Sequence, residues 1–93
     1  MKVDFRKIKA ENVDGTTAEI SVSEQLGNQI YQMAMTEEEM NFGREIFKNG
    51  EVDLNKIRAS IIEKYLNNTT FVAFAKSAIL KAMEGITDEE IKN

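Results

Sequence analysis

The chain begins with two stretches in which apolar and polar residues alternate, residues 5–10 and 17–22. Alternation with a period of two is typical of β-strands that bury one face. Asp14-Gly15 lies between the two stretches, and glycine tolerates the positive φ that a tight hairpin turn requires. The pattern therefore predicts a β-hairpin over residues 1–22.

The alternation changes parity within the first predicted strand. Val3 and Phe5 would face one side of the sheet, whereas the next apolar residues, Ile8 and Ala10, would face the other. We therefore expect either a bulge near Arg6-Lys7 or a strand that is partly covered on both faces.

From about residue 23 the apolar period becomes helical, and capping signals divide the sequence into four helices. The sequence places them at about 23–34, 37–48, 54–66 and 70–84. Thr36 and Glu39 form a capping box at the start of the second helix. Gly50 suits a left-handed residue at its end. Asp53 is expected to cap the third helix.

The helical period also predicts which residues face the core. Gly27 is expected to let a neighbouring helix approach closely. Either Thr69 or Thr70 is expected to cap the last helix, and Gly85 to end it. The expected inward residues of the first three helices are Leu26, Ile30, Met33, Ala34, Met40, Gly43, Ile46, Phe47, Leu54, Ile57, Ile61, Ile62 and Tyr65.

Residues 70–84 carry the widest apolar surface of the chain. On a helical wheel at about 100° per residue, the apolar residues from Phe74 round to Met83 cover roughly half the circumference. Leu80 extends apolar surface onto the opposite flank. A helix on the outside of a small domain needs a narrower stripe. We therefore expect this helix to be central, or to pack partly against a second copy of the protein.

The order of these elements predicts an α+β fold that is mostly helical, with an N-terminal β-hairpin packed on a bundle of about four helices. We expect one domain over residues 1–93, divided into the hairpin (1–22), the helical bundle (23–85) and a short C-terminal tail (86–93). A lone two-stranded hairpin is marginal in water, so it must pack on the helices or pair with a partner's strand.

Composition narrows the functional classes. The net charge is −4, although Lys2, Arg6, Lys7 and Lys9 make residues 1–10 basic. An acidic protein argues against nucleic acid as the main partner, because phosphate binding needs clustered lysine and arginine. The basic segment is interpreted as a charge-protected edge strand, with a phosphate-contacting strip as the alternative. Absence of cysteine, of a signal peptide and of a membrane-spanning segment predicts a cytoplasmic protein without membrane contact.

The sequence favours no catalytic or metal chemistry. Histidine is absent, which removes the commonest general base and zinc ligand, and no glycine-rich phosphate loop is present. Residues 48–53 resemble a calcium-binding loop, but the alignment puts Phe47 at a ligand position and Lys56 where a bidentate glutamate is needed. We therefore predict a non-enzymatic protein with no cofactor and no metal.

Protein contacts remain as the predicted activity. Met35 lies on the polar side of its helix, and Tyr31 and Phe42 lie at the margins of apolar faces, where they could anchor an interface. The full set of candidate interface residues is Phe71, Val72, Phe74, Ile79, Leu80, Met83, Met35, Tyr31 and Phe42.

Three segments in the first 55 residues also carry a resemblance. They are Lys2-Val3-Asp4-Phe5-Arg6-Lys7-Ile8, Leu26-Gly27-Asn28-Gln29-Ile30-Tyr31, and Gly43-Arg44-Glu45-Ile46-Phe47 followed by Gly50-Glu51-Val52. Together they resemble small uncharacterised proteins encoded in bacteriophages and prophages. The resemblance implies an accessory or assembly role in the host cytoplasm, and it carries over no functional residue.

Two functions therefore stand as hypotheses. The first is a non-catalytic phage-type accessory or assembly protein that acts through self-association, as a homodimer or higher oligomer, and through contacts with other phage or host proteins. The alternative is a small acidic inhibitor or adaptor that binds a host defence or regulatory protein, with Glu37, Glu38 and Glu39 as its densest acidic run.

Overall fold

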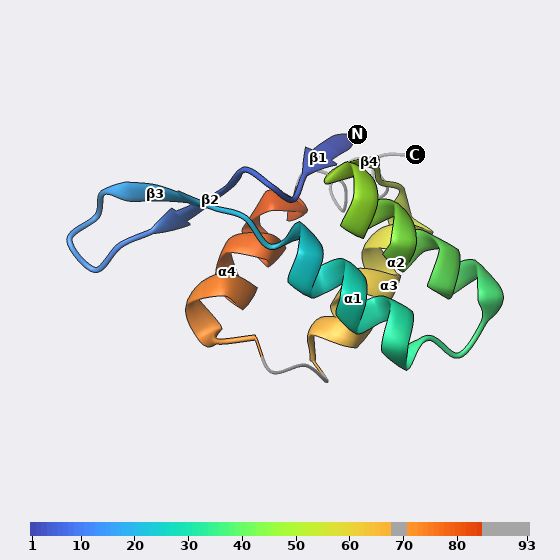
Figure 1. Ribbon diagram of the computed structural model, residues 1–93. Coiled ribbons are helices and arrows are strands. Elements are labelled where there is room, and N and C mark those ends of the chain that lie inside the picture. Colours follow the sequence, from blue (N-terminus) through green and yellow to red (C-terminus); the bar gives the residue numbers. More distant parts are fainter. Residues whose placement is uncertain (68–70, 85–93) are drawn as a thin grey trace.

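The computed structural model describes residues 1–67 and 71–84. It confirms the expected α+β class, with four helices and short antiparallel strands. In chain order the elements are β1 (Lys2–Asp4), β2 (Ile8–Glu11), β3 (Thr17–Ile20), α1 (Ser23–Met33), α2 (Glu37–Asn49), β4 (Glu51–Asp53), α3 (Lys56–Leu66) and α4 (Ala73–Ala82) (Figure 1).

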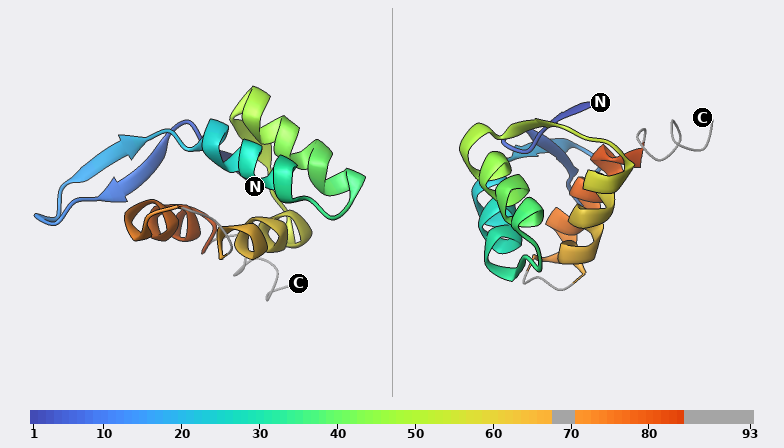
Figure 2. Two further views of the ribbon diagram at one scale, coloured as in Figure 1. Left: turned by 60° about the horizontal axis from the view of Figure 1, so that its bottom comes forward. Right: turned by 90° about the vertical axis from the view of Figure 1, so that its right-hand side faces the viewer.

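The predicted hairpin is confirmed for β2 and β3. The two strands pair antiparallel, with Ile8 opposite Ile20 and Ala10 opposite Ala18. The hairpin extends away from α1 and α2 and lies over α4 (Figure 2). Its buried face therefore packs on a helix, as a marginal two-stranded ribbon requires.

The parity change in the first strand has a different cause from the one expected. β1 leaves the hairpin and pairs antiparallel with β4, with Val3 opposite Val52. Between β1 and β2 the chain turns at residues 5–7, where the Lys7 N–H donates to the Asp4 carbonyl oxygen at 3.0 Å. A turn between two sheets, and not a bulge, separates the two apolar faces.

Helices α1 and α2 pack at very close range through two glycines, as the sequence predicted for Gly27. A Cβ on Gly27 would lie 2.6 Å from the Gly43 carbonyl oxygen, and one on Gly43 would lie 2.8 Å from the Gly27 carbonyl oxygen. Leu26, Ile30 and Ile46 are fully buried beside this crossing. The glycines thus allow the two backbones to touch, and the flanking side chains fill the core.

The helix ends partly follow their predicted caps. The Thr36 hydroxyl accepts a hydrogen bond from the Glu39 N–H at 3.1 Å, which confirms the cap of α2. Gly50 ends α2 with a φ of +74°. The predicted cap of α3 is wrong, because Asp53 is the last residue of β4 and the Asn55 side chain accepts from the Arg58 N–H at 2.9 Å instead.

Most predicted core residues are buried, but the inward face of α2 is rotated from the expected one. Phe42 is buried, whereas Phe47 is 46% exposed. On α3, Ile57 is exposed, and Ala59 and Leu66 occupy the core instead. The buried side chains of all elements form one cluster that also includes Val3, Phe5, Val52 and Leu54.

Helix α4 lies at the periphery, so the expectation that it is the central helix is wrong. Ala78 and Ile79 of α4 are buried against the core and β2, as are Phe71 and Met83 at its two ends, whereas Val72, Phe74 and Leu80 stay exposed. The predicted cap of this helix at Thr69 or Thr70 is wrong, because Val72 is its N-cap, with no side-chain cap hydrogen bond. Thr69, Thr70, Gly85 and the tail lie outside the described residues. None of the described helices is long and apolar enough to cross a membrane.

Candidate functional site

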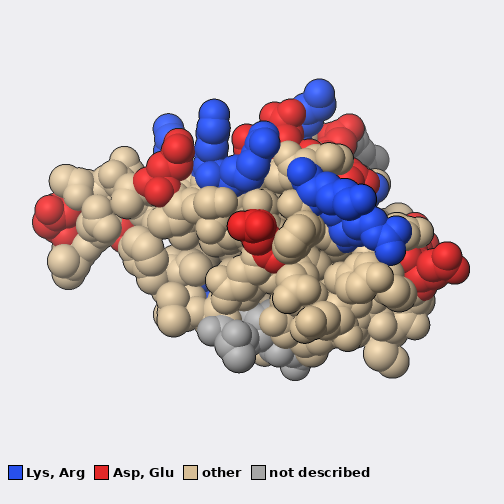
Figure 3. Space-filling view, in the orientation of Figure 1, with Lys and Arg blue, Asp and Glu red and all other residues tan. Residues whose placement is uncertain are grey.

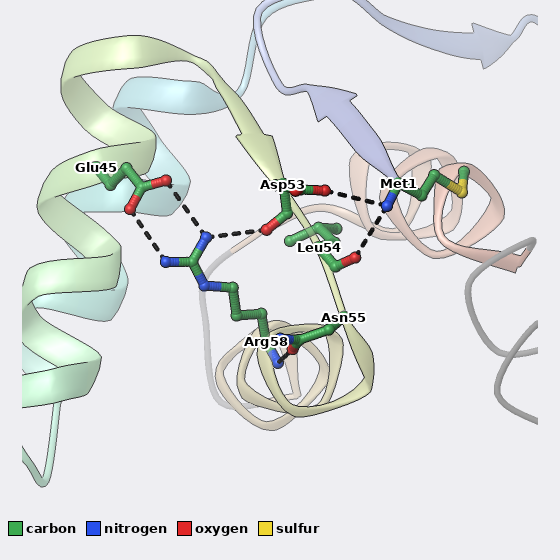
Figure 4. Close-up of polar contacts among 6 residues, drawn as sticks. All are labelled: Met1, Glu45, Asp53, Leu54, Asn55 and Arg58. Carbon is green, nitrogen blue, oxygen red and sulfur yellow. Dashed lines mark hydrogen bonds and ion pairs between the residues drawn. The ribbon is translucent and has the colours of Figure 1, made fainter.

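Arg58 joins α2, β4 and α3 through a set of polar contacts that stabilise the fold (Figure 4). Its guanidinium donates to both Glu45 carboxylate oxygens, at 3.3 and 3.1 Å, and to the Asp53 carbonyl oxygen at 2.9 Å. It also lies 4.7 Å from the centre of the Phe42 ring. The Met1 amine binds the Asp53 carboxylate at 3.1 Å, which ties the start of the chain to the same strand. Because Arg58 is fully engaged within the fold, we assign it a structural role.

A second polar cluster joins the start of α2 to the end of α3. The buried Tyr65 hydroxyl donates to the Glu39 carboxylate, which also accepts from the Met35 N–H at 3.1 Å and lies 3.5 Å from the Lys64 ammonium. The Tyr65 hydrogen bond lowers the pKa of Glu39, and burial raises the pKa of Tyr65. Glu39 therefore stays ionised near neutral pH, and Glu37 and Glu38 are the members of the acidic run that remain exposed.

Two surface hollows gather the residue types that recognise other molecules. The first, of about 210 Å³, lies on the outer side of the α1–α2 crossing and is lined by Gly27, Asn28, Tyr31, Arg44 and Phe47. The Arg44 guanidinium donates to the Tyr31 hydroxyl at 3.3 Å and lies 5.4 Å from the centre of its ring. The hollow thus combines two exposed aromatic side chains and an arginine with Gly27 and Asn28.

The second hollow is basic and lies between the strands and α4. Its volume is about 340 Å³, and its lining includes Lys2, Lys7, Lys9 and Lys81. The Asp4 carboxylate in its wall is paired with Arg6 at 3.0 Å, and this hydrogen bond lowers the pKa of Asp4. Figure 3 shows lysine and arginine side chains projecting above the strands along one edge of the molecule.

The nine candidate interface residues do not lie on one surface. Tyr31 borders the first hollow, Phe74 lies beside the second, Met35 is 79% exposed in the α1–α2 turn, and Val72 and Leu80 are exposed on α4. The other four are buried within the subunit: Phe42, Phe71, Ile79 and Met83. Self-association itself stays a prediction, and the five exposed residues are the ones that can take part in it without unfolding.

Sequence reasoning missed two residues of these hollows. Phe47 follows the apolar period of α2, which predicts a core position, and Lys81 is not among the candidate residues. Lys2 and Lys9 lie on two different strands, Lys7 lies in the turn between them, and Lys81 lies in the last turn of α4. Their convergence depends on how α4 packs under β2, which periodicity does not determine.

Comparison of the chain with known proteins found no relative. No family model matches the chain, and searches of curated proteins and of solved structures found no match. Within the described ranges, no group of three or more metal-binding side chains is placed to hold an ion. The two hollows are therefore the candidate binding surfaces, and the resemblance to small phage proteins stays a prediction.

Proposed function

We propose that this protein is a non-catalytic accessory or assembly protein that acts by binding itself and other proteins. The observation that supports this is the hollow over the α1–α2 crossing, where Tyr31 and Phe47 stay exposed beside Arg44. Tyrosine and arginine are among the residues that contribute most binding energy at protein interfaces, above all around a pocket. An exposed phenylalanine beside them adds apolar surface that gains free energy when it leaves water.

A second copy of the chain is the proposed occupant. If two copies meet about a two-fold axis, Phe47 of each subunit packs against the hollow of the other, and such an isologous contact closes at a dimer. Few side chains line the hollow, so we expect a reversible dimer that dissociates on dilution. The exposed flank of α4, with Val72 67% and Leu80 42% exposed, supplies a further apolar surface for larger assemblies.

Light scattering after size-exclusion chromatography tests the proposal over a range of protein concentrations. We expect the mean mass of the wild type to rise toward twice the monomer mass of 10.6 kDa as concentration increases. Phe47→Gln should keep the monomer mass at every concentration. Ile57→Gln, which changes an exposed apolar residue outside the hollow, is the matched control and should behave as the wild type.

The α4 flank is tested in the same experiment by Leu80→Gln. If Leu80→Gln prevents association and Phe47→Gln does not, the chain associates through α4 and the proposed dimer geometry is wrong. If the wild type stays monomeric at every concentration, the proposal of self-association is wrong.

A further inference from the structure

Strand β2 has one edge that no other described strand covers. The Asn12 N–H donates to the Thr16 carbonyl oxygen at 2.7 Å, and the same register pairs Ala10 with Ala18. Hydrogen-bonded pairs alternate along an antiparallel ladder, so the backbone groups of Lys9 and Glu11 point away from β3. In the described ranges β2 pairs with β3 alone. The backbone donors and acceptors of Lys9 and Glu11 therefore face an open edge.

This open edge forms one wall of a groove whose other wall is α4. The basic hollow of about 340 Å³ and a neighbouring hollow of about 240 Å³ share Lys9, Ala78 and Lys81. The neighbouring hollow adds Glu11, Phe74 and Ser77. The four residues of β2 span about 13 Å at 3.3 Å per residue, so the groove has the length of a short strand.

The groove also concentrates positive charge on a protein whose net charge is −4. Among the described residues, Lys2, Lys7, Lys9 and Lys81 form no ion pair with a carboxylate. Asp4 and Glu11 are the acidic residues in the lining of the two hollows, and the Asp4 carboxylate is bound by Arg6, so the groove keeps an excess of positive charge. Ammonium groups that gather along one edge repel each other, and an anionic partner relieves this repulsion.

We propose that this groove binds an extended acidic segment of a partner protein, which adds to the free edge of β2 as a further antiparallel or parallel strand. The backbone of Lys9 and Glu11 supplies the hydrogen bonds, as in other cases of strand addition. Alternate side chains of the bound segment face α4, where Phe74 and Ala78 offer apolar surface. Carboxylates at the intervening positions lie on the face of the strand that carries Lys9, which is exposed between the buried Ile8 and Ala10.

Charge complementarity and the open strand edge together favour a peptide over a nucleic acid. A single-stranded nucleic acid needs a basic track with several aromatic platforms, whereas this groove has one phenylalanine and a glutamate at the same end. The inference concerns a different surface from the α1–α2 hollow, so self-association and peptide binding can each fail without the other.

Fluorescence anisotropy with a labelled octapeptide of alternating glutamate and valine tests the proposal. Lys9→Glu/Lys81→Glu should weaken binding about tenfold or more, because it reverses two of the four charges in the groove. Lys56→Glu, which reverses an exposed lysine that lines neither hollow, should change the affinity less than about twofold. Circular dichroism verifies folding, and Lys9→Gln/Lys81→Gln replaces the reversal if it unfolds the protein.

Two further probes separate strand addition from general attraction of anions. The same octapeptide with every backbone nitrogen methylated keeps its charges but cannot donate to a strand, and it should bind about tenfold more weakly or not at all. Equal affinity for both peptides overturns the proposed geometry. Tighter binding of an oligothymidylate than of the peptide, or no loss of peptide affinity in Lys9→Glu/Lys81→Glu, overturns the proposed partner class.

Discussion

Replacement of Gly27 by alanine should destabilise the protein, although alanine is the better helix former. In an exposed helix the change from glycine to alanine stabilises by about 1 kcal/mol. Here the added Cβ would lie 2.6 Å from both the Gly43 carbonyl oxygen and the Phe47 amide nitrogen. Both atoms belong to the α2 backbone, so neither can move aside as the end of a flexible side chain could.

The size of the effect follows from these distances. Non-bonded contacts of a carbon atom are optimal at about 3.5 Å, so α1 and α2 must separate by roughly 0.9 Å to make room for the added Cβ. A gap of about this size loses roughly a quarter to a half of the dispersion energy of each contact between the two helices. Overpacking of a core costs about 1–3 kcal/mol, and the rigid obstacle places Gly27→Ala at the upper end. After the gain in helix propensity, we expect a net loss of about 2 kcal/mol.

Urea unfolding followed by circular dichroism measures this loss. In thermal unfolding of a chain of this length, a loss of about 2 kcal/mol corresponds to a decrease in Tm of roughly 8–16 °C. Asn41→Ala, on the exposed face of α2, is the control and should change the free energy of unfolding by less than about 0.5 kcal/mol. If Gly27→Ala is as stable as the wild type or more stable, the helices do not approach as closely as described, and the reasoning is refuted.

Three further predictions test other contacts of the fold. Tyr65→Phe should cost about 1–3 kcal/mol at neutral pH, because it removes a buried hydrogen bond to a carboxylate. The pKa of Glu39 lies below its ordinary value of 4.5 in the folded state, so the stability that this group contributes is present above pH 4.5 and is lost as the pH falls through the folded pKa. The free energies of unfolding of the wild type and Tyr65→Phe should therefore converge in acid. A constant difference down to low pH would contradict the assignment. Asn55→Ala should cost about 1 kcal/mol through loss of the α3 cap, whereas an unchanged stability of Asn55→Ala would contradict its assignment as the cap. Gly50→Ala should unfold at lower urea concentration than Gly15→Ala, because both residues have positive φ but only a Cβ on Gly50 meets the Arg6 side chain.

The elements with a strong local pattern could be predicted from the sequence, and those that depend on distant pairing could not. The β2–β3 hairpin and the Thr36 cap follow from alternation, a turn and one hydroxyl within a few residues. The β1–β4 pair joins three-residue strands about 50 positions apart. Such short strands show no period, and their pairing is decided by tertiary packing.

The rotation of α2 and the placement of the hollows have the same origin. Phe42 and Phe47 flank the apolar stripe of α2 on opposite sides, so the helical period alone does not say which of them is buried. In the structure Phe42 is the buried one, and Arg58 of α3 lies over its ring at 4.7 Å from the centre. Phe47 therefore lies at the surface beside Tyr31, although its place in the apolar period predicts a core position.

The glycine crossing connects the stability of the fold to the proposed contact surface. Gly27 and Gly43 let α1 and α2 touch, and Gly27 is also one of the residues that line the hollow beside this crossing. A change at Gly27 that pushes the two helices apart therefore also changes the shape of the hollow. It follows that Gly27→Ala should reduce self-association as well as stability, and that Gly43→Ala, whose residue does not line the hollow, should reduce association less for a comparable loss of stability.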